Sequence, residues 1–154
     1  MPLKIGDKAP DFSGKSIADQ IISLEDYRGK KHVFLVFYPL AFSPVCSVQL
    51  PTYNRHLDGF KSRDTGVIAV SVDSAWSQKA FCDSLGGIDF PVLSDMKLEI
   101  AGRYGVALPE GFSTRAEFLI DKQGIIRWLN IEKNPGDDTP TMEDIFNAID
   151  HSQP

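Results

Sequence analysis

Short apolar runs alternating with helical patterns constrain the fold of this chain more than any other feature. The runs are rich in β-branched and aromatic residues, and they predict strands at residues 33–38, 67–72, 90–93, 117–121 and 125–131. Helical spacing predicts helices at residues 44 to about 60, 74–85, 96–104 and 141 to about 151. Strands that alternate with helices in this way predict a layered α/β domain.

The sheet is expected to be mixed, because only "KQG" separates the last two strands and so short a connection favours an antiparallel hairpin. A length of 154 residues suits one domain, and no linker, repeat or low-complexity tract interrupts the sequence. Residues 1–154 are therefore expected to form a single domain.

Composition and charge argue against several classes of partner. The chain is 42% hydrophobic and 24% charged, as in ordinary globular proteins, and its net charge is -5. Its longest basic cluster is "GKK", so nucleic acid is not an expected partner. The N-terminal stretch "MPLKIGDKAPDF" lacks the apolar core of a secretory signal, and no apolar run is long enough to span a membrane. We therefore expect a cytoplasmic protein.

The first cysteine, Cys46, follows Ser-Pro where an apolar strand gives way to a helix. Ser43 is a suitable N-cap and Pro44 suits the first helical position, so Cys46 falls in the first turn. Unpaired backbone N-H groups and the helix dipole stabilise an anion there, which favours a reactive thiolate. A cysteine on an apolar helix face can also be an inert buried residue, and this interpretation stays open.

Pro51 lies seven residues into the same helix, where it removes a backbone donor and crowds the Ser47 carbonyl. A simple kink accounts for such a proline. Local unwinding around Cys46 is the alternative hypothesis.

The second cysteine, Cys82, is predicted to lie off the apolar face of its helix. On a helical projection that starts from Trp76, Phe81 and Leu85 fall on one side and Cys82 on another. A cysteine near the polar side suggests a chemical role, such as a partner for oxidised Cys46.

Other kinds of site find little support in the sequence. The three histidines are isolated and the two cysteines do not form a CxxC pair, so neither a zinc site nor a dithiol reductase is expected. Nucleotide-binding glycine motifs and the GxSxG elbow are absent. The 21 acidic residues are scattered and are expected to be mostly surface charge. Spacing alone leaves a Cys-His hydrolase open, although no local signature favours one.

The segment "PLAFSPVC", residues 39–46, resembles the Pro-x-x-x-Thr/Ser-x-x-Cys signature of the peroxiredoxins. Similar segments follow the family's order, namely "IGDKAPDF", "FPVLSD", "YGV" and "STRAEFLIDKQGIIR", so the resemblance extends from Ile5 to about His151. Within the family, "FYPLAF" resembles the alkyl hydroperoxide reductase E type, and Ser-Pro-Val-Cys also suits the bacterioferritin comigratory protein, or PrxQ, type.

The resemblance implies a thioredoxin-like fold with an extra N-terminal hairpin, and thiol peroxidase activity without a metal or other cofactor. Matched to the signature, Cys46 is the peroxidatic cysteine, Pro39 shields it and Ser43 supplies the hydroxyl. Arg115 takes the position of the active-site arginine, and the N-H groups of Val45 and Cys46 are expected to face the substrate. The expected substrates are hydrogen peroxide and organic hydroperoxides.

Cys82 matches the helix on which some PrxQ-type proteins carry a resolving cysteine. We therefore expect an intramolecular Cys46–Cys82 disulfide that thioredoxin or a glutaredoxin-like protein reduces. A one-cysteine cycle and a peroxide sensor are the alternatives. The family also suggests a possible homodimer, with Leu40, Ala41 and Phe42 near the contact.

Overall fold

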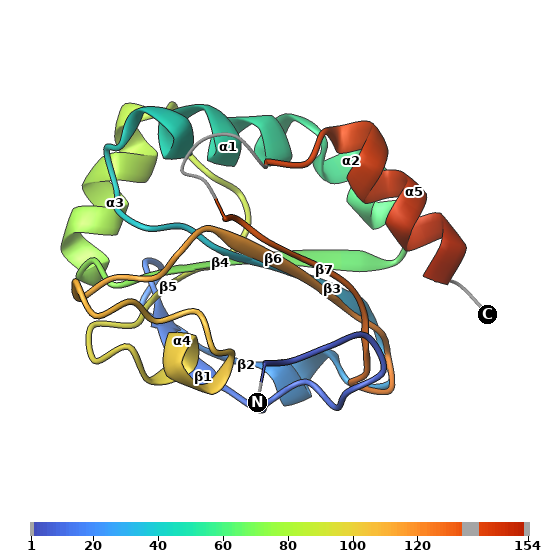
Figure 1. Cartoon of the computed structure of the whole chain (residues 1–154). Helices are drawn as coiled ribbons and strands as arrows, with labels where there is room; N and C mark the ends of the chain where they lie inside the picture. Colours follow the sequence, from blue (N-terminus) through green and yellow to red (C-terminus); the bar gives the residue numbers. More distant parts are fainter. Residues whose placement is uncertain (1, 134–138, 153–154) are drawn as a thin grey trace.

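The computed structural model describes residues 2–133 and 139–152 of the chain (Figure 1). The strands are β1 (Ser13–Ser16), β2 (Ile21–Ser23), β3 (His32–Phe37), β4 (Thr65–Ser71), β5 (Val92–Ser94), β6 (Ala116–Ile120) and β7 (Ile126–Ile131). The α-helices are α1 (Pro44–Arg55), α2 (Leu57–Lys61), α3 (Ala75–Ser84), α4 (Glu99–Arg103) and α5 (Met142–Ser152), and a 3-10 helix, η1, spans Leu24–Tyr27.

The strands form one mixed sheet in the order β2-β1-β5-β4-β3-β6-β7. Strand β4 pairs in parallel with β3 and with β5, whereas β6 runs antiparallel to both β3 and β7. The β6–β7 hairpin confirms the prediction from "KQG", and its Gly124 takes a positive φ of 83° that favours glycine. The β1–β2 hairpin joins the sheet through antiparallel pairing with β5.

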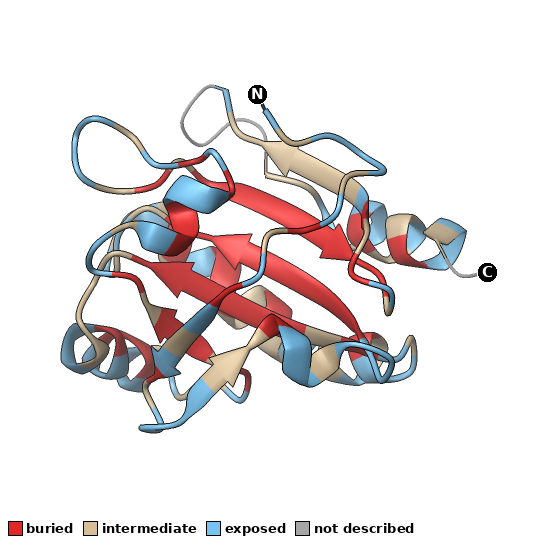
Figure 2. Ribbon diagram, turned by 90° about the horizontal axis from the view of Figure 1, so that it is seen from below, coloured by how far each residue is buried: buried red, intermediate tan, exposed pale blue. Residues whose placement is uncertain are grey.

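Each face of the sheet carries its own hydrophobic core. Helices α1, α2, α3 and α5 cover one face, whereas α4, η1 and the N-terminal segment cover the other (Figure 1). Alternation along β3 serves both cores, since Phe34 and Val36 belong to the first and Val33 and Leu35 to the second. Figure 2 shows the central strands buried along most of their length, with exposed residues on the loops and outer helix faces.

The five predicted strands are confirmed to within two residues at each end. The helix predicted at residues 74–85 is α3, and Ser74 caps it by accepting a hydrogen bond from the Ser77 amide at 3.1 Å. The helix predicted at residues 141–151 is α5.

The prediction of one continuous helix over residues 44–60 is wrong. The helix breaks at His56, whose φ of -108° and ψ of 17° are not helical, and α2 begins at Leu57. Tertiary packing accounts for the short second helix, because Phe60 stacks on Phe34 at 5.4 Å and lies against Phe146 of α5 at 5.1 Å. Such contacts are not visible in local sequence spacing.

The helix predicted at residues 96–104 is shorter than expected. It begins at Glu99, after Leu98 has taken a left-handed conformation with φ of 57°. The Asp95 carboxylate fixes this start by accepting hydrogen bonds from the amides of Ile100 at 3.0 Å and Ala101 at 2.9 Å. None of the helices in the described ranges has the length and apolar character that a membrane crossing requires.

Replacing Gly59 with alanine is expected to destabilise the protein by about 1–3 kcal/mol, because a Cβ there would lie 2.6 Å from Cζ of Phe146. Gly102→Ala in α4 is the matched control, since a Cβ at that position meets nothing within 4 Å. The control should be neutral or slightly stabilising. Urea unfolding measures both variants, and equal effects would contradict the packing between α2 and α5.

Candidate active site

The connection from β3 to α1 presents Cys46 in the first turn of the helix, as predicted. Ser43 is the N-cap with an extended backbone, Pro44 occupies the first helical position, and the Ser47 amide donates to the Ser43 carbonyl at 3.0 Å. The amides of Val45 and Cys46 precede this first intrahelical bond, so helix geometry leaves them without an acceptor inside the helix. The cysteine thus lies at the positive end of α1.

Arg115 immediately precedes β6 and reaches Cys46. Its Nη1 donates to the Cys46 Sγ at 3.2 Å and also to Oε1 of Gln49, while its Nε donates to Oε2 of Glu132 at 3.0 Å. The arginine side chain is 5% exposed and that of Glu132 is 7% exposed. A guanidinium stays charged in proteins, and its attraction to an anion strengthens when water is excluded. It therefore favours an anionic sulfur.

Sequence reasoning missed the groups that hold this arginine. Gln49 follows Cys46 by three residues, on the same face of α1, and its Nε2 donates to the Tyr53 hydroxyl at 2.8 Å. That spacing could have indicated it. Glu132 lies just after β7, and only the β6–β7 register brings it beside Arg115, whose carbonyl accepts from the Glu132 amide at 2.9 Å.

The other predicted site residues surround the same helix start. Ser43 Oγ is buried and has no hydrogen-bond partner among the described residues. Pro39 and Val45 are half-buried, in the loop after β3 and in the first turn of α1. A buried hydroxyl without a partner costs free energy, which a substrate oxygen able to donate or accept a hydrogen bond would recover.

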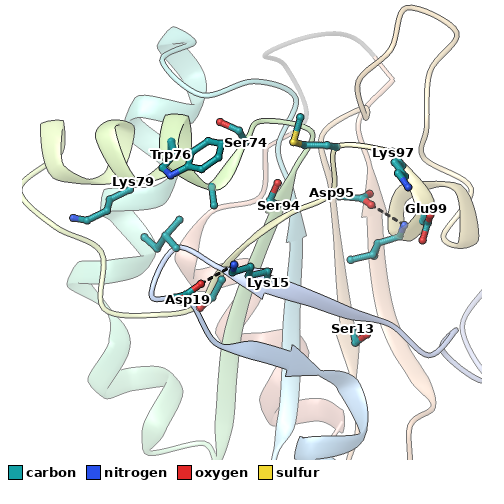
Figure 3. Close-up of a pocket in the computed structure, with 15 residues that line it drawn as sticks. Ser13, Lys15, Asp19, Ser74, Trp76, Lys79, Ser94, Asp95, Lys97 and Glu99 are labelled. Atoms are coloured by element: carbon teal, nitrogen blue, oxygen red, sulfur yellow. Dashed lines mark hydrogen bonds and ion pairs between the residues drawn. The ribbon is translucent and has the colours of Figure 1, made fainter.

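Cys46 itself is fully enclosed, with 0% of its surface exposed. A cavity of about 820 Å³ lies elsewhere, between β1, the start of α3 and the β5–α4 connection (Figure 3). Trp76 and Lys79 border it, and Lys15 pairs there with Asp19 at 2.7 Å. None of the predicted site residues lines this cavity. Within residues 2–133 and 139–152, no three histidine, cysteine or acidic side chains gather as metal ligands would.

The prediction that Cys82 lies off the apolar face of its helix is wrong. Cys82 is 1% exposed and belongs to the same core as Cys46, whereas Trp76, the reference for the projection, is 86% exposed. The buried face of α3 consists of Gln78, Phe81 and Cys82. Gln78 can face inward because its Nε2 donates to Ser71 Oγ and to the Leu93 carbonyl, both at 2.8 Å.

The surroundings of Cys82 connect it to the loop before Cys46. Burial raises the pKa of the Cys82 thiol to about 11, so this thiol is protonated near neutral pH. Its neighbour Phe81 contacts Phe42 with ring centroids 5.1 Å apart and Tyr38 at 6.1 Å. Both cysteines are free in this structure.

The AhpC/TSA family model matches residues 5–129. A chloroplastic 2-cysteine peroxiredoxin of Chattonella marina var. antiqua is 40% identical, over 99% of this chain and 84% of the relative. The chain belongs to the peroxiredoxins. A mitochondrial thioredoxin-dependent peroxide reductase of Drosophila melanogaster is 37% identical, over 86% of this chain and 61% of the relative. As a peroxiredoxin, this protein is a thiol peroxidase that reduces peroxides through a cysteine.

Solved structures support the same assignment. The reduced 2-Cys peroxiredoxin of Plasmodium vivax superposes with a TM-score of 0.87 and 30% identity, over 97% of this chain and 96% of that one. The expected thioredoxin-like fold with an N-terminal hairpin is thereby confirmed for this peroxiredoxin. The comparisons support the family without favouring the alkyl hydroperoxide reductase E or PrxQ type.

Breaking the buried Arg115–Glu132 pair should reduce the free energy of unfolding. Arg115→Met is expected to cost about 3–5 kcal/mol, because it removes the Arg115 cation from the buried Glu132 carboxylate. The double variant Arg115→Met/Glu132→Met should recover most of that loss, since it removes both charges. Urea unfolding in a double-mutant cycle measures the coupling, and strictly additive losses would contradict this pairing.

Proposed function

We propose that the Cys46 thiolate attacks the terminal oxygen of a hydroperoxide. A sulfur-oxygen bond forms as the O-O bond breaks, the departing oxygen takes a proton and leaves as water or an alcohol, and Cys46 becomes a sulfenic acid. The observation that carries this proposal is the 3.2 Å hydrogen bond from Arg115 Nη1 to the Cys46 sulfur inside an enclosed site.

The neighbouring groups have distinct roles in this mechanism. Arg115 stabilises the thiolate and the charge that develops on the departing oxygen, together with the N-H groups of Val45 and Cys46. The Ser43 hydroxyl donates to one peroxide oxygen or accepts from it, and its buried, unpartnered oxygen supports this role. Pro39 shields the sulfur from bulk water.

Substrate entry requires a small movement, because Cys46 is fully enclosed. The loop between β3 and α1 is the segment that moves in this mechanism. Within it, Phe42 holds a positive φ of 67° that is unfavourable for a bulky residue, and this residue is 58% exposed. A shift of this loop relieves the backbone strain and opens a path to the sulfur.

Cys82 resolves the oxidised cysteine in the favoured cycle. Its thiol attacks the Cys46 sulfenic sulfur, forming a Cys46–Cys82 disulfide and releasing water. A disulfide requires Cα atoms about 4.4–6.8 Å apart, and Cys82 is buried in the last turn of α3, so in this cycle the start of α1 and the end of α3 shift or unwind. Pro51 weakens α1 near the site, and the Phe42–Phe81 ring contact couples the loop to α3.

The proposed reductant is thioredoxin, by analogy with the thioredoxin-dependent relative from Drosophila melanogaster, with a glutaredoxin-like protein as the alternative. The proposed substrates are hydrogen peroxide and organic hydroperoxides. A homodimer with Leu40, Ala41 and Phe42 near its contact is also proposed, because Leu40 and Phe42 are both exposed apolar residues. The cytoplasmic location remains a prediction, as does the resemblance to the alkyl hydroperoxide reductase E and PrxQ types.

The burial of Cys82 also favours a second candidate, a one-cysteine cycle in which Cys82 is a bystander. In that cycle an external thiol attacks the Cys46 sulfenic acid directly. A peroxide sensor would likewise be oxidised at Cys46, but it would not turn over many times with a thioredoxin system.

Cys46→Ser should abolish peroxide consumption, because a serine hydroxyl is not ionised near neutral pH and does not replace the thiolate. The measurement is rapid mixing of reduced protein with hydrogen peroxide and with an organic hydroperoxide, followed by intact-mass analysis. Cys82→Ser is the matched control, since it removes the other thiol and should keep the first oxidation at the wild-type rate. Peroxide consumption by Cys46→Ser would contradict the assignment.

Cys82→Ser should accumulate Cys46 sulfenic acid and recycle slowly with thioredoxin. Wild type treated with one equivalent of peroxide should instead lose two hydrogens in mass and remain monomeric on a non-reducing gel. A stable sulfenic acid beside a free Cys82 in wild type would establish the one-cysteine cycle. A disulfide-linked dimer would exclude the intramolecular bond.

A further inference from the structure

Glu117 is a buried acidic residue that takes no part in the proposed mechanism. It lies within β6 with 0% of its surface exposed, between Val36 on β3 and Asn130 on β7. Neither of its carboxyl oxygens forms a hydrogen bond of ordinary geometry with a described residue, although the side chain of Asn130, opposite on β7, favours the ionised form. A carboxylate is strongly destabilised in such a setting, whereas a protonated carboxyl is much less so.

The position of Glu117 links it to the site. It follows Arg115 by two residues along an extended segment, so both side chains lie on the sheet face that α1 covers. Tyr53 of α1 lies close enough to Glu117 to be affected by its charge. Burial is the main cause that raises the pKa of Tyr53, and the charge of Glu117 is the next. The charged groups that act on Glu117 are therefore Arg115 on its own segment and Glu132 after β7, and the titratable Tyr53 of α1 lies close to it.

Two groups already draw on the positive charge of Arg115 in this enclosure. Arg115 supplies a single positive charge, and it already contacts the Glu132 carboxylate and the Cys46 sulfur. An ionised Glu117 would add a third anionic group around that cation and would compete with the thiolate. A protonated Glu117 leaves the guanidinium to the sulfur and to Glu132.

We propose that Glu117 is a positioning residue whose bound proton keeps the Arg115 charge available to Cys46, so that loss of this proton at alkaline pH slows the peroxidase. This inference rests on the proposed function of Cys46. Burial raises the pKa of Glu117 to about 8, while the Arg115 charge acts in the opposite direction. Tyr53 does not cause the same effect, because its raised pKa keeps it protonated in this range.

The first test is the pH profile of a single turnover. Reduced wild type, Glu117→Gln and the surface control Glu143→Gln are mixed with hydrogen peroxide between pH 6 and 9.5, and Cys46 oxidation is counted by mass. If only the protonated form supports reaction, the wild-type rate should fall about tenfold between pH 7 and 9. Glu117→Gln cannot ionise and should fall less than twofold, whereas Glu143→Gln should keep the wild-type profile. An alkaline decline in Glu117→Gln equal to that of wild type would overturn the proposal.

The second test is the pH dependence of stability, which does not require activity. The pKa of Glu117 is raised in the folded protein above its usual value of 4.5, to about 8. Between these two pH values the folded protein therefore holds a proton on Glu117 that the unfolded chain has lost. Its stabilising contribution is complete below about pH 4.5 and is lost as the pH rises through about 8. The melting temperature of Glu117→Gln relative to wild type should therefore increase steadily from pH 5 to 8. A constant difference would overturn the proposal.

The proposed role of Cys46 and the proposed role of Glu117 can be contradicted separately. If Cys46 is not the nucleophile, wild type consumes no peroxide through it at any pH. If only the role of Glu117 is wrong, wild type is active and Glu117→Gln shares its alkaline decline. Either result contradicts the inference about Glu117, and only the first contradicts the proposed function.

Discussion

The contact between the Arg115 guanidinium and the Cys46 sulfur is the interaction on which the site depends. It requires three groups from different parts of the chain to meet: Cys46 at the start of α1, Arg115 just before β6 and the buried Glu132 carboxylate after β7. The helix supplies partial positive charge, and the arginine supplies a full one in a position from which water is excluded. Gln49 and Glu132 fix its orientation, so that the charge is held at the sulfur without a partner molecule.

Much of the fold could be predicted from sequence because its signals are local. The apolar run of β3, the cap at Ser43 and Pro44, and the tight β6–β7 turn each depend on neighbouring residues alone. The break at His56 depends on α5, more than eighty residues away in the sequence, and a helical pattern alone does not reveal it. The start of α4 likewise depends on the Asp95 carboxylate rather than on periodicity.

The sequence predicts the residues of the candidate site that belong to a family-like motif. It does not predict those that come beside them only through the packing of the folded chain. Cys46, Ser43 and Arg115 stand in segments that resemble the family, whereas Glu132 lies outside them and comes beside Arg115 only through strand register. The helical projection places Cys82 wrongly because the apolar Trp76 is exposed and the polar Gln78 is buried, so apolar character alone does not mark the buried face of α3. In this protein, polar residues such as Gln78 form part of the interior.

The order of the strands has a consequence for biosynthesis. Cys46 follows β3 directly, but Arg115 leaves the ribosome 69 residues later and reaches the sulfur only when the segment leading into β6 has paired beside β3. A nascent chain that has just exposed Cys46 to the surroundings therefore carries an ordinary thiol. In the proposed mechanism, activation of that thiol arrives with the last third of the polypeptide, so reactivity of Cys46 toward peroxide would report completed folding.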